Sequence, residues 1–211
     1  MNNQKREREV VRKTRARRIP NLGYYIIVTD TKETEQNYIN GLKRSIPKEY
    51  QDRLVIKVIK TSTCNLVSDA LNEFTNNAQY GEPWILFDRD QVKNFDDIIR
   101  EAEIHSINVA WTNPCLEEWF YAYFGSMPNT QDSVKCCEAF SAIFRRKTGQ
   151  EYKKSDEKIY EKLNMYGDEK LAINIASIKY RSNISAGHVK PSQMNPCTTL
   201  HLLISEIKNK I

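Results

Sequence analysis

The sequence predicts an α/β fold in which a parallel sheet is flanked by helices and followed by a helical C-terminal region. Two observations support this prediction. Between residues 24 and 111, short runs of β-branched and aromatic residues alternate with segments in which apolar residues recur at helical spacing. After Pro114, only the helical spacing continues. Strands that alternate with helices imply right-handed crossovers, which place helices on both faces of a parallel sheet.

Strands and helices alternate in the first half of the chain. Each expected strand is a short apolar run bounded by polar or turn-forming residues, and each expected helix carries one apolar stripe. The expected strands cover residues 24–30, 54–59, 84–88 and 107–111. The expected helices cover residues 34–44, 66–76 and 96–105. Gly81 and Pro83 are expected to interrupt the chain just before the third strand.

The second half of the chain is expected to be helical. An apolar face runs from Leu116 to Phe124, and further helices are expected over residues 134–146, 156–165 and 168–180 and from Thr198 onward. In the helix over 134–146, the expected inward positions are Val134, Ala139, Ala142 and Ile143. Gly149 suits the C-cap of that helix. The expected organisation is therefore a basic arm (1–19), an α/β domain (20–125) and a helical region (126–211).

The positive charge of the chain lies in its first residues. Residues 1–18 hold eight Lys and Arg against two Glu, whereas the whole chain has a net charge of +5, so the remainder is close to neutral. A basic arm suits a polyanion, because each cation that neutralises a phosphate releases counterions. The alternative is a solvated tail that only aids solubility. The residues expected to contact nucleic acid are Arg12, Lys13, Arg15, Arg17 and Arg18 in the arm, and Arg89 in the domain.

Several classes of protein are not expected from the composition. No apolar run approaches the ~18 residues that a membrane span needs, and the N-terminal residues lack the apolar core of a secretory signal. The five cysteines show no Cys-x-x-Cys spacing, which favours reduced thiols in a cytoplasmic protein over a disulfide framework or a zinc site. The chain also lacks the P-loop pattern, so any coupling to ATP hydrolysis of that kind needs a separate partner.

Carboxylates follow two of the expected strands. Asp30 ends the first apolar run, and Asp88 and Asp90 end the third. The carboxyl ends of parallel strands share one edge of the sheet, where ligands bind, so these three side chains are expected to lie together. Clustered carboxylates repel one another unless a cation lies between them, and hard ions such as Mg²⁺ or Mn²⁺ prefer oxygen ligands. The alternative for the Asp-x-Asp pair is an ordinary strand-terminating turn.

Two further carboxylates are expected at helix starts. Thr34 or Thr31 is a possible N-cap for the helix after the first strand, and Glu35 suits the positive end of that helix. Glu117 follows a predicted Asn113 cap with Pro114 at the first helical position, and it either favours the helix dipole or faces the metal site.

A second Asn-Pro pair is predicted to cap the last helix. It consists of Asn195 and Pro196, ahead of Thr198. His201 follows within an apolar helical stretch, and a lone histidine of this kind is more often a core residue than a ligand.

These motifs, taken in this order, resemble those of the RloB-like family. The matching stretches are residues 29–38, 84–90, 112–119 and 195–198, preceded by a basic arm. The resemblance implies a Toprim-type domain, the metal-binding α/β fold of topoisomerases, primases and OLD-type nucleases. It also implies a role in restriction-linked or abortive-infection defence, often beside an AAA or ABC-type ATPase. On that basis Asp30 would serve as general acid/base, and Asp88 and Asp90 would bind the metal.

The chain departs from the family at the first motif. The family's Glu-Gly pair is Asp30-Thr31 here, and Asp is shorter by one methylene. A misplacement of about 1 Å can lower a rate ~10²-fold. Either Glu33 or Glu35 compensates, or catalysis is weak or lost.

The function expected from these observations is Mg²⁺- or Mn²⁺-dependent cleavage of nucleic acid in antiphage defence. RNA, tRNA included, or DNA would be the substrate, and a partner ATPase would control the reaction. The proposed catalytic residues are Asp30, Glu35 and Glu117. The alternatives are a catalytically weak module that binds nucleic acid or a partner, and a structural adaptor for the ATPase.

Overall fold

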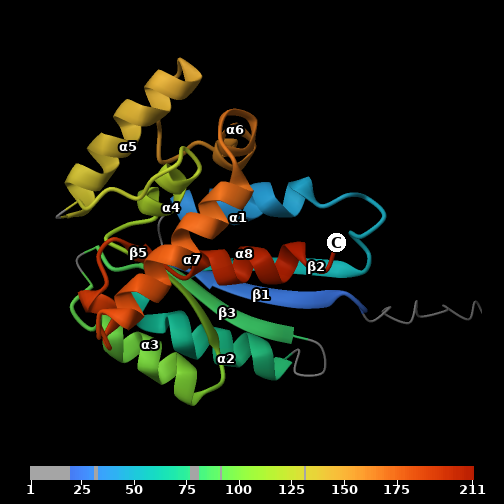
Figure 1. Cartoon of the computed structure of the whole chain (residues 1–211). Helices are drawn as coiled ribbons and strands as arrows, with labels where there is room; N and C mark the ends of the chain where they lie inside the picture. Colours follow the sequence, from blue (N-terminus) through green and yellow to red (C-terminus); the bar gives the residue numbers. More distant parts are fainter. Residues whose placement is uncertain (1–19, 31–32, 77–80, 91, 131) are drawn as a thin grey trace, which may run out of the picture.

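A five-stranded sheet organises the part of the chain that the computed structural model describes, which is residues 20–30, 33–76, 81–90, 92–130 and 132–211. The strand order is β2-β1-β3-β4-β5 (Figure 1). The pairs β1–β2, β1–β3 and β3–β4 are parallel, and β4–β5 is antiparallel. The strands are β1 (Gly23–Thr29), β2 (Leu54–Lys60), β3 (Gly81–Asp88), β4 (Asn108–Asn113) and β5 (Cys197–Thr198).

Helices connect the parallel strands and fill the second half of the chain. They are α1 (Glu33–Ser45), α2 (Leu66–Asn76), α3 (Phe95–Ile104), α4 (Glu117–Ala122), α5 (Ser133–Thr148), α6 (Ile159–Tyr166), α7 (Glu169–Ser185) and α8 (Leu200–Lys208), with short 3-10 turns η1 (Thr63–Asn65) and η2 (Pro191–Gln193). The α/β fold class is therefore confirmed. Among the described residues, no helix is both long and apolar enough to cross a membrane. The predicted arm lies outside the described residues.

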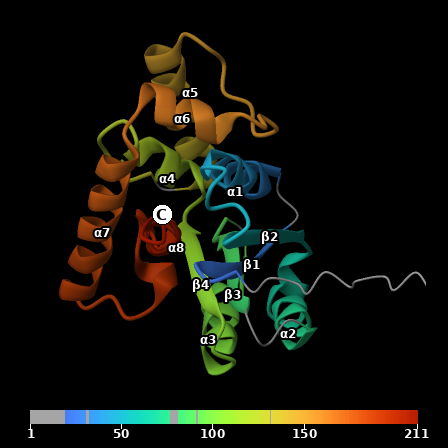
Figure 2. The same ribbon diagram turned by 90° about the vertical axis from the view of Figure 1, so that its right-hand side faces the viewer.

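Two apolar cores lie on opposite faces of the sheet (Figure 2). Because side chains alternate along a strand, Tyr25 and Ile27 of β1 join the core beneath α1, α4 and α8, whereas Ile26 and Val28 join the core beneath α2 and α3. β1 is buried on both faces, which explains why its sequence is a continuous apolar run rather than an alternating one.

A glycine sets the distance between α1 and α6. A Cβ at Gly41 would lie 2.3 Å from Cβ of Tyr160, so any larger residue would push the two helices apart. The segment between α5 and α6 is held beside the start of α1 as well, because the Thr34 hydroxyl donates to the Lys154 carbonyl (3.3 Å). Packing of α6 on α1 thus carries this segment to the carboxyl edge of the sheet.

The third strand begins earlier than predicted. β3 starts at Gly81, so Pro83 lies within the strand and does not end the preceding loop. Pairing of β3 with β4 begins only at Trp84, so the missing N–H of Pro83 precedes that ladder.

The short strand β5 was not predicted. It adds two residues, Cys197 and Thr198, to the edge of the sheet beside β4. Two residues are too few to show a strand period. The predicted boundary near residue 125 stays a prediction, although β5 and the buried face of α8 extend the α/β core.

The inward face of α5 also differs from the prediction. Val134 and Ala142 are exposed, and the buried positions are Cys136, Phe140, Ile143 and Phe144. The aromatic rings decide the helix orientation because they bury more apolar surface than Val or Ala. The predicted C-cap is confirmed, since Gly149 has φ 71° and its N–H donates to Arg145.

Neither Asn-Pro pair caps a helix. Asn113 is the last residue of β4, and α4 begins at Glu117. The Asn113 amide donates to the carbonyls of Pro191 and Ser192 (3.2 and 3.3 Å), and the Asn195 amide donates to that of Thr130 (3.1 Å). Both side chains therefore tie together loops, and both Asn-Pro bonds are cis. The sequence interpretation of His201 is supported, because it is buried and its Nδ1 lies 3.0 Å from the Thr198 carbonyl.

Candidate functional site

Two buried aspartates lie at the carboxyl ends of neighbouring strands. Asp30 follows β1 and Asp88 ends β3, and Thr29 pairs with Leu86 in the β1–β3 ladder. The two aspartate residues are 2% and 3% exposed. Burying charges in this way is costly unless cations or hydrogen-bond donors compensate them. The register and the burial therefore fit the predicted carboxylate edge at these two positions.

Asp90 has a different environment. β3 ends at Asp88, so the strand alternation that would aim Asp90 like Asp88 does not continue. Asp90 is exposed with φ 31°, its N–H donates to the Pro114 carbonyl (2.9 Å), and its Oδ1 accepts from the Ser133 hydroxyl. It lies on a turn that contacts the start of α5.

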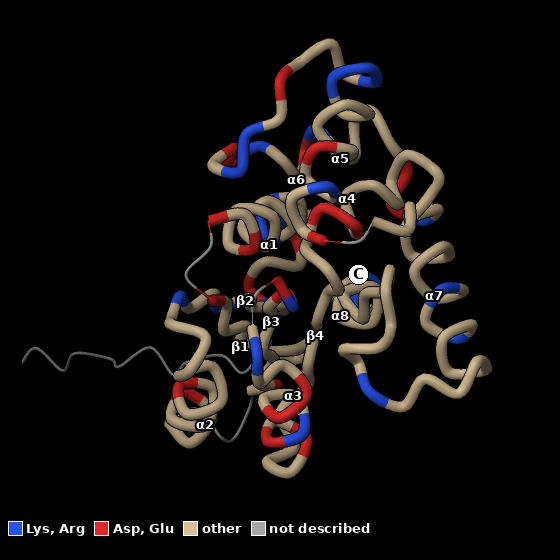
Figure 3. The backbone as a smooth tube through the Cα atoms, turned by 90° about the vertical axis from the view of Figure 1, so that its left-hand side faces the viewer, with Lys and Arg blue, Asp and Glu red and all other residues tan. Residues whose placement is uncertain are grey.

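The buried Glu35 lies in the first turn of α1 and is 1% exposed. Thr34 is inside α1 rather than ahead of it, so it is not the N-cap, and Thr31 lies outside the described residues. Acidic residues fill the first turns of both α1 and α4, which are red in Figure 3. Glu35 therefore adds a carboxylate at the helix that follows Asp30.

Glu117 opens α4 and holds a lysine. Its Oε1 accepts from the Tyr152 hydroxyl at 2.8 Å and lies 3.5 Å from Lys154 Nζ. Burial alone would raise the pKa of Glu117, but the Lys154 charge and the hydrogen bonds from Cys115 and Tyr152 outweigh it and lower this pKa. The Lys154 side chain is 57% exposed. Burial opposes its charge, but Glu117 raises the pKa of Lys154 above its usual value. Lys154 therefore keeps its positive charge beside Glu117.

Glu118 points away from this pair into the protein. It is fully buried, and its Oε1 accepts from the Thr130 hydroxyl (2.9 Å) and the Cys136 thiol (3.4 Å). Its Oε2 accepts no hydrogen bond from the described residues. Burial raises the pKa of Glu118 to about 7, so its carboxyl is partly protonated at neutral pH.

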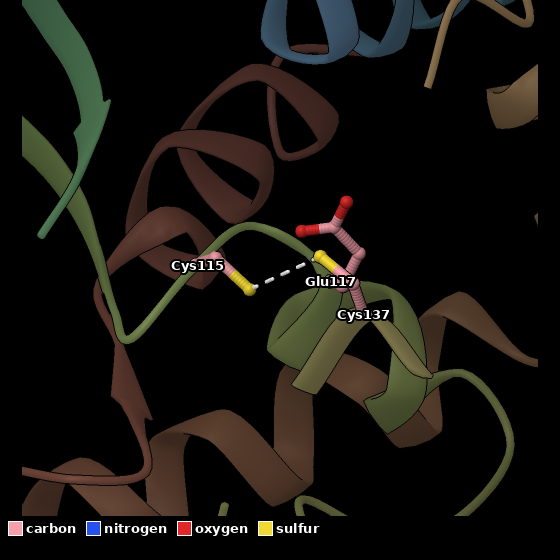
Figure 4. A group of neighbouring side chains, drawn as sticks. All are labelled: Cys115, Glu117 and Cys137. Carbon is pink, nitrogen blue, oxygen red and sulfur yellow. Dashed lines mark hydrogen bonds between the residues drawn. The ribbon is translucent and has the colours of Figure 1, made fainter. Parts of the chain in front are cut away.

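Two thiols lie beside Glu117. Figure 4 shows Cys115, Glu117 and Cys137, whose sulfur and oxygen atoms all lie within 4.8 Å of one another. In the part of the chain that the structure describes, this is the one group of three His, Cys, Asp or Glu side chains that meets so closely. The trio Asp30, Asp88 and Asp90 does not meet that distance. The hydrogen bond that Cys115 makes with Cys136 raises the pKa of Cys115, and burial raises it further. The hydrogen bond that Cys137 makes with Cys115, together with burial, likewise raises the pKa of Cys137.

Sequence reasoning missed Tyr152, Lys154 and Cys137. The first two lie in an irregular segment far from the strands in sequence. Tyr152 reaches Glu117 because its ring packs edge-on against Phe140 of α5 (centroids 4.7 Å apart). Cys137 lies in α5, and no motif marks it. Only the fold brings these residues to the sheet edge.

The predicted nucleic-acid contacts are only partly described. Arg89 is half-buried and lines a pocket with Lys93, Lys190 and Asp90. The other five predicted contacts, in the arm, lie outside the described residues. Arg89 thus stands at the carboxyl edge, next to the aspartates.

The family model described as RloB-like protein matches residues 25–207, which is most of the chain. No curated protein and no solved structure matches the chain.

Proposed function

Because the chain belongs to the RloB-like family, we propose that it is a metal-dependent nuclease of antiphage defence built on a Toprim-type domain. Its substrate would be RNA, tRNA among the candidates, or DNA. The observation that carries the proposal is the pair of buried carboxylates, Asp30 and Asp88, at adjacent strand ends. Ligands of α/β sheets bind at this edge.

The donor set supports a hard divalent ion. Carboxylate oxygens from neighbouring strands suit Mg²⁺ or Mn²⁺, and burial makes a nearby cation favourable. Asp30 and Asp88 would hold the ion, with Asp90 as the third predicted ligand. Once bound, a Mg²⁺ or Mn²⁺ ion would orient the scissile phosphate and offset its charge. Asp90 would need to turn away from Ser133 to take part.

The neighbouring side chains suggest how the chain would act on a phosphodiester. Asp30 or Glu35 would accept the proton of the attacking water, since Asp30 ends the strand that borders the proposed ion and Glu35 lies in the first turn of the helix that follows. Glu117 would contribute by fixing Lys154, whose ammonium would bind a non-bridging phosphate oxygen. Arg89 would bind a flanking phosphate.

A second candidate function rests on the Asp30-Thr31 departure from the family's Glu-Gly. If the shorter carboxylate fails to reach the reacting atoms, the site would bind nucleic acid or a partner without cleaving. Cleavage separates the two candidates. Wild-type protein should cut tRNA or plasmid DNA in the presence of Mg²⁺ or Mn²⁺ and should not do so in EDTA. Tight binding of the same substrates, with no cleavage in the presence of either metal ion, would favour the binding module.

Lys154 should matter to the rate more than to the fold. Replacing Lys154 by Gln is expected to lower the rate of cleavage ~10²-fold, because a positive group at the phosphate is lost. Lys154→Arg should retain most of the rate. The matched control is Lys153→Gln, since Lys153 is the exposed neighbour of Lys154, and among the described residues the ion pair with Glu117 is made by Lys154. Equal cleavage rates for Lys154→Gln and Lys153→Gln would show that Lys154 does not bind the substrate phosphate.

The basic arm should contribute to affinity through charge. Deleting residues 1–18 is expected to weaken nucleic-acid binding and to flatten its dependence on salt, because fewer counterions are released. Fluorescence anisotropy at several salt concentrations measures both effects. An unchanged affinity and slope would assign the arm another role.

A partner ATPase is part of the proposal, since the chain lacks a P-loop. The last helix is a poor docking surface, because Leu203, Ile204 and Ile207 of α8 lie in the core. In α7, Ile178 and Ile184 are about half exposed, which makes that helix the better candidate.

A further inference from the structure

The two thiols and the carboxylate of Cys115, Glu117 and Cys137 form a group that the nuclease proposal does not use as a ligand set. Cys115 lies in the connection from β4 to α4, Glu117 is the first residue of α4, and Cys137 lies in α5. We propose that this thiol–carboxylate group is a second metal site, separate from the aspartate edge, and that it takes Zn²⁺.

The spacing of the sulfur atoms favours a metal ion over a disulfide. Cys115 Sγ and Cys137 Sγ lie 4.0 Å apart. Two thiolates on a tetrahedral Zn²⁺, at about 2.3 Å each, lie about 3.8 Å apart. A disulfide needs about 2.05 Å, so the sulfur atoms would have to approach each other by about 2 Å. Zinc binding requires a shift of only about 0.2 Å from the distance in the structure.

The donor chemistry selects the ion. Two sulfur ligands and one carboxylate oxygen suit a borderline-soft ion such as Zn²⁺, whereas Mg²⁺ and Mn²⁺ prefer oxygen alone. The site therefore differs in chemistry from the aspartate edge, which offers carboxylates. Three protein ligands leave a fourth tetrahedral position for water.

The surroundings supply an orienting shell and an entry path. The Cys115 thiol is hydrogen-bonded to Cys137 Sγ (4.0 Å), so an ion between the two sulfur atoms would take the place of the thiol proton that lies there, and the displaced protons would pass to solvent. Tyr152 and Lys154 both contact Glu117 Oε1 (2.8 and 3.5 Å), and outer partners of this kind commonly orient metal ligands. Cys115 and Glu117 are buried but Cys137 is half-buried, so the group is reached from the Cys137 side.

Zinc at this position would join α4 to α5. The ion would hold Glu117 against α5, the helix that carries Cys137. Because Glu117 pairs with Lys154, the ion would also help to position the Lys154 ammonium group. The ion would thus link α4 to α5, and its binding does not depend on whether the aspartate edge cleaves nucleic acid.

Cobalt spectroscopy tests the proposal on the full chain. Co²⁺ added to reduced, metal-free protein should give the near-ultraviolet sulfur-to-cobalt absorption and the intense visible bands of a tetrahedral site, and equimolar Zn²⁺ should abolish both. Cys137→Ser should remove most of the sulfur-to-cobalt absorption. Two controls should retain it: Cys64→Ser, which removes an exposed thiol elsewhere, and Asp88→Asn, which removes an aspartate of the other site.

A second measurement does not depend on how well a variant folds. Zn²⁺ should slow alkylation of Cys137 in the wild type at least tenfold, whereas Mg²⁺ should leave the alkylation rate unchanged. Absence of the cobalt bands together with unprotected Cys137 would overturn the second site. Equal bands in Cys137→Ser and wild type would do the same. Loss of nuclease activity with intact cobalt bands would instead count against the nuclease proposal alone.

Discussion

Replacing Asp88 by Asn is expected to lower the rate of metal-dependent cleavage by ~10³-fold or more, because the variant loses a charged metal ligand at the sheet edge. The amide keeps the size of the side chain. The melting temperature without metal shows whether the variant still folds. Single-turnover cleavage and a thermal melt measure the two effects.

The matched control for this change is Asp97→Asn. Asp97 is an exposed aspartate of α3 that pairs with Arg100 on the surface (2.7 Å), and its replacement should leave the rate within about twofold. Asp30→Asn should be as inactive as Asp88→Asn. Should Asp30→Asn cleave like the wild type while Glu35→Gln is inactive, the proton-accepting role would belong to the start of α1.

Replacing Glu118 by Gln is expected to remove a pH-dependent loss of stability. Burial raises the pKa of Glu118 to about 7 in the folded protein, against an ordinary value of 4.5. Between these values the folded state holds a proton that the unfolded state has released, so the contribution of Glu118 to stability falls as pH rises from about 4.5 to 7. The size of this loss is about 3 kcal/mol in the free energy of unfolding.

Urea unfolding of EDTA-treated protein at pH 5 and pH 8 measures this effect. Wild type should lose more stability between the two pH values than Glu118→Gln does, because the amide does not titrate. Glu138→Gln, an exposed change on α5, should behave like the wild type. Glu117 has the opposite effect on stability, because its lowered pKa favours the folded state at pH values above the ordinary pKa of glutamate. All three proteins contain Glu117, so its effect cancels in the comparison. Parallel pH profiles for wild type and Glu118→Gln would contradict the assigned burial effect.

The sequence predicted the regular part of the fold because that part is governed by local patterns. β1, β2 and α2 lie within a residue or two of their predicted bounds, since each has an unbroken apolar run or stripe. β5 was not predicted because two residues are too few to show the alternation of apolar and polar side chains that marks a strand. It forms through pairing with β4. The outward turn of Val134 in α5 is a tertiary effect, because Phe140 and Phe144 dominate the packing of that helix.

The candidate site was predictable only where it follows strand ends. Asp30 and Asp88 lie at adjacent ends because parallel register dictates it. The prediction that Asp90 lies beside Asp88 assumed that the strand continues for two more residues. The chain turns there instead, and the Asp90 carboxylate accepts a hydrogen bond from the Ser133 hydroxyl. Lys154 and Cys137 come from segments that share no motif with the strands. Lys154 reaches Glu117 because α6 packs on α1 and Tyr152 packs on α5, and Cys137 reaches it because α5 packs on α4.

Direct titration with Mn²⁺ tests the metal assignment at the aspartate edge most closely. The free ion is followed by its electron paramagnetic resonance signal in the presence of wild type, Asp88→Asn and Cys137→Ser. Wild type and Cys137→Ser should each remove Mn²⁺ from solution with the same affinity, and Asp88→Asn should lose that binding. No bound Mn²⁺ in the wild type, or unchanged binding in Asp88→Asn, would contradict a divalent-ion site formed by Asp30 and Asp88.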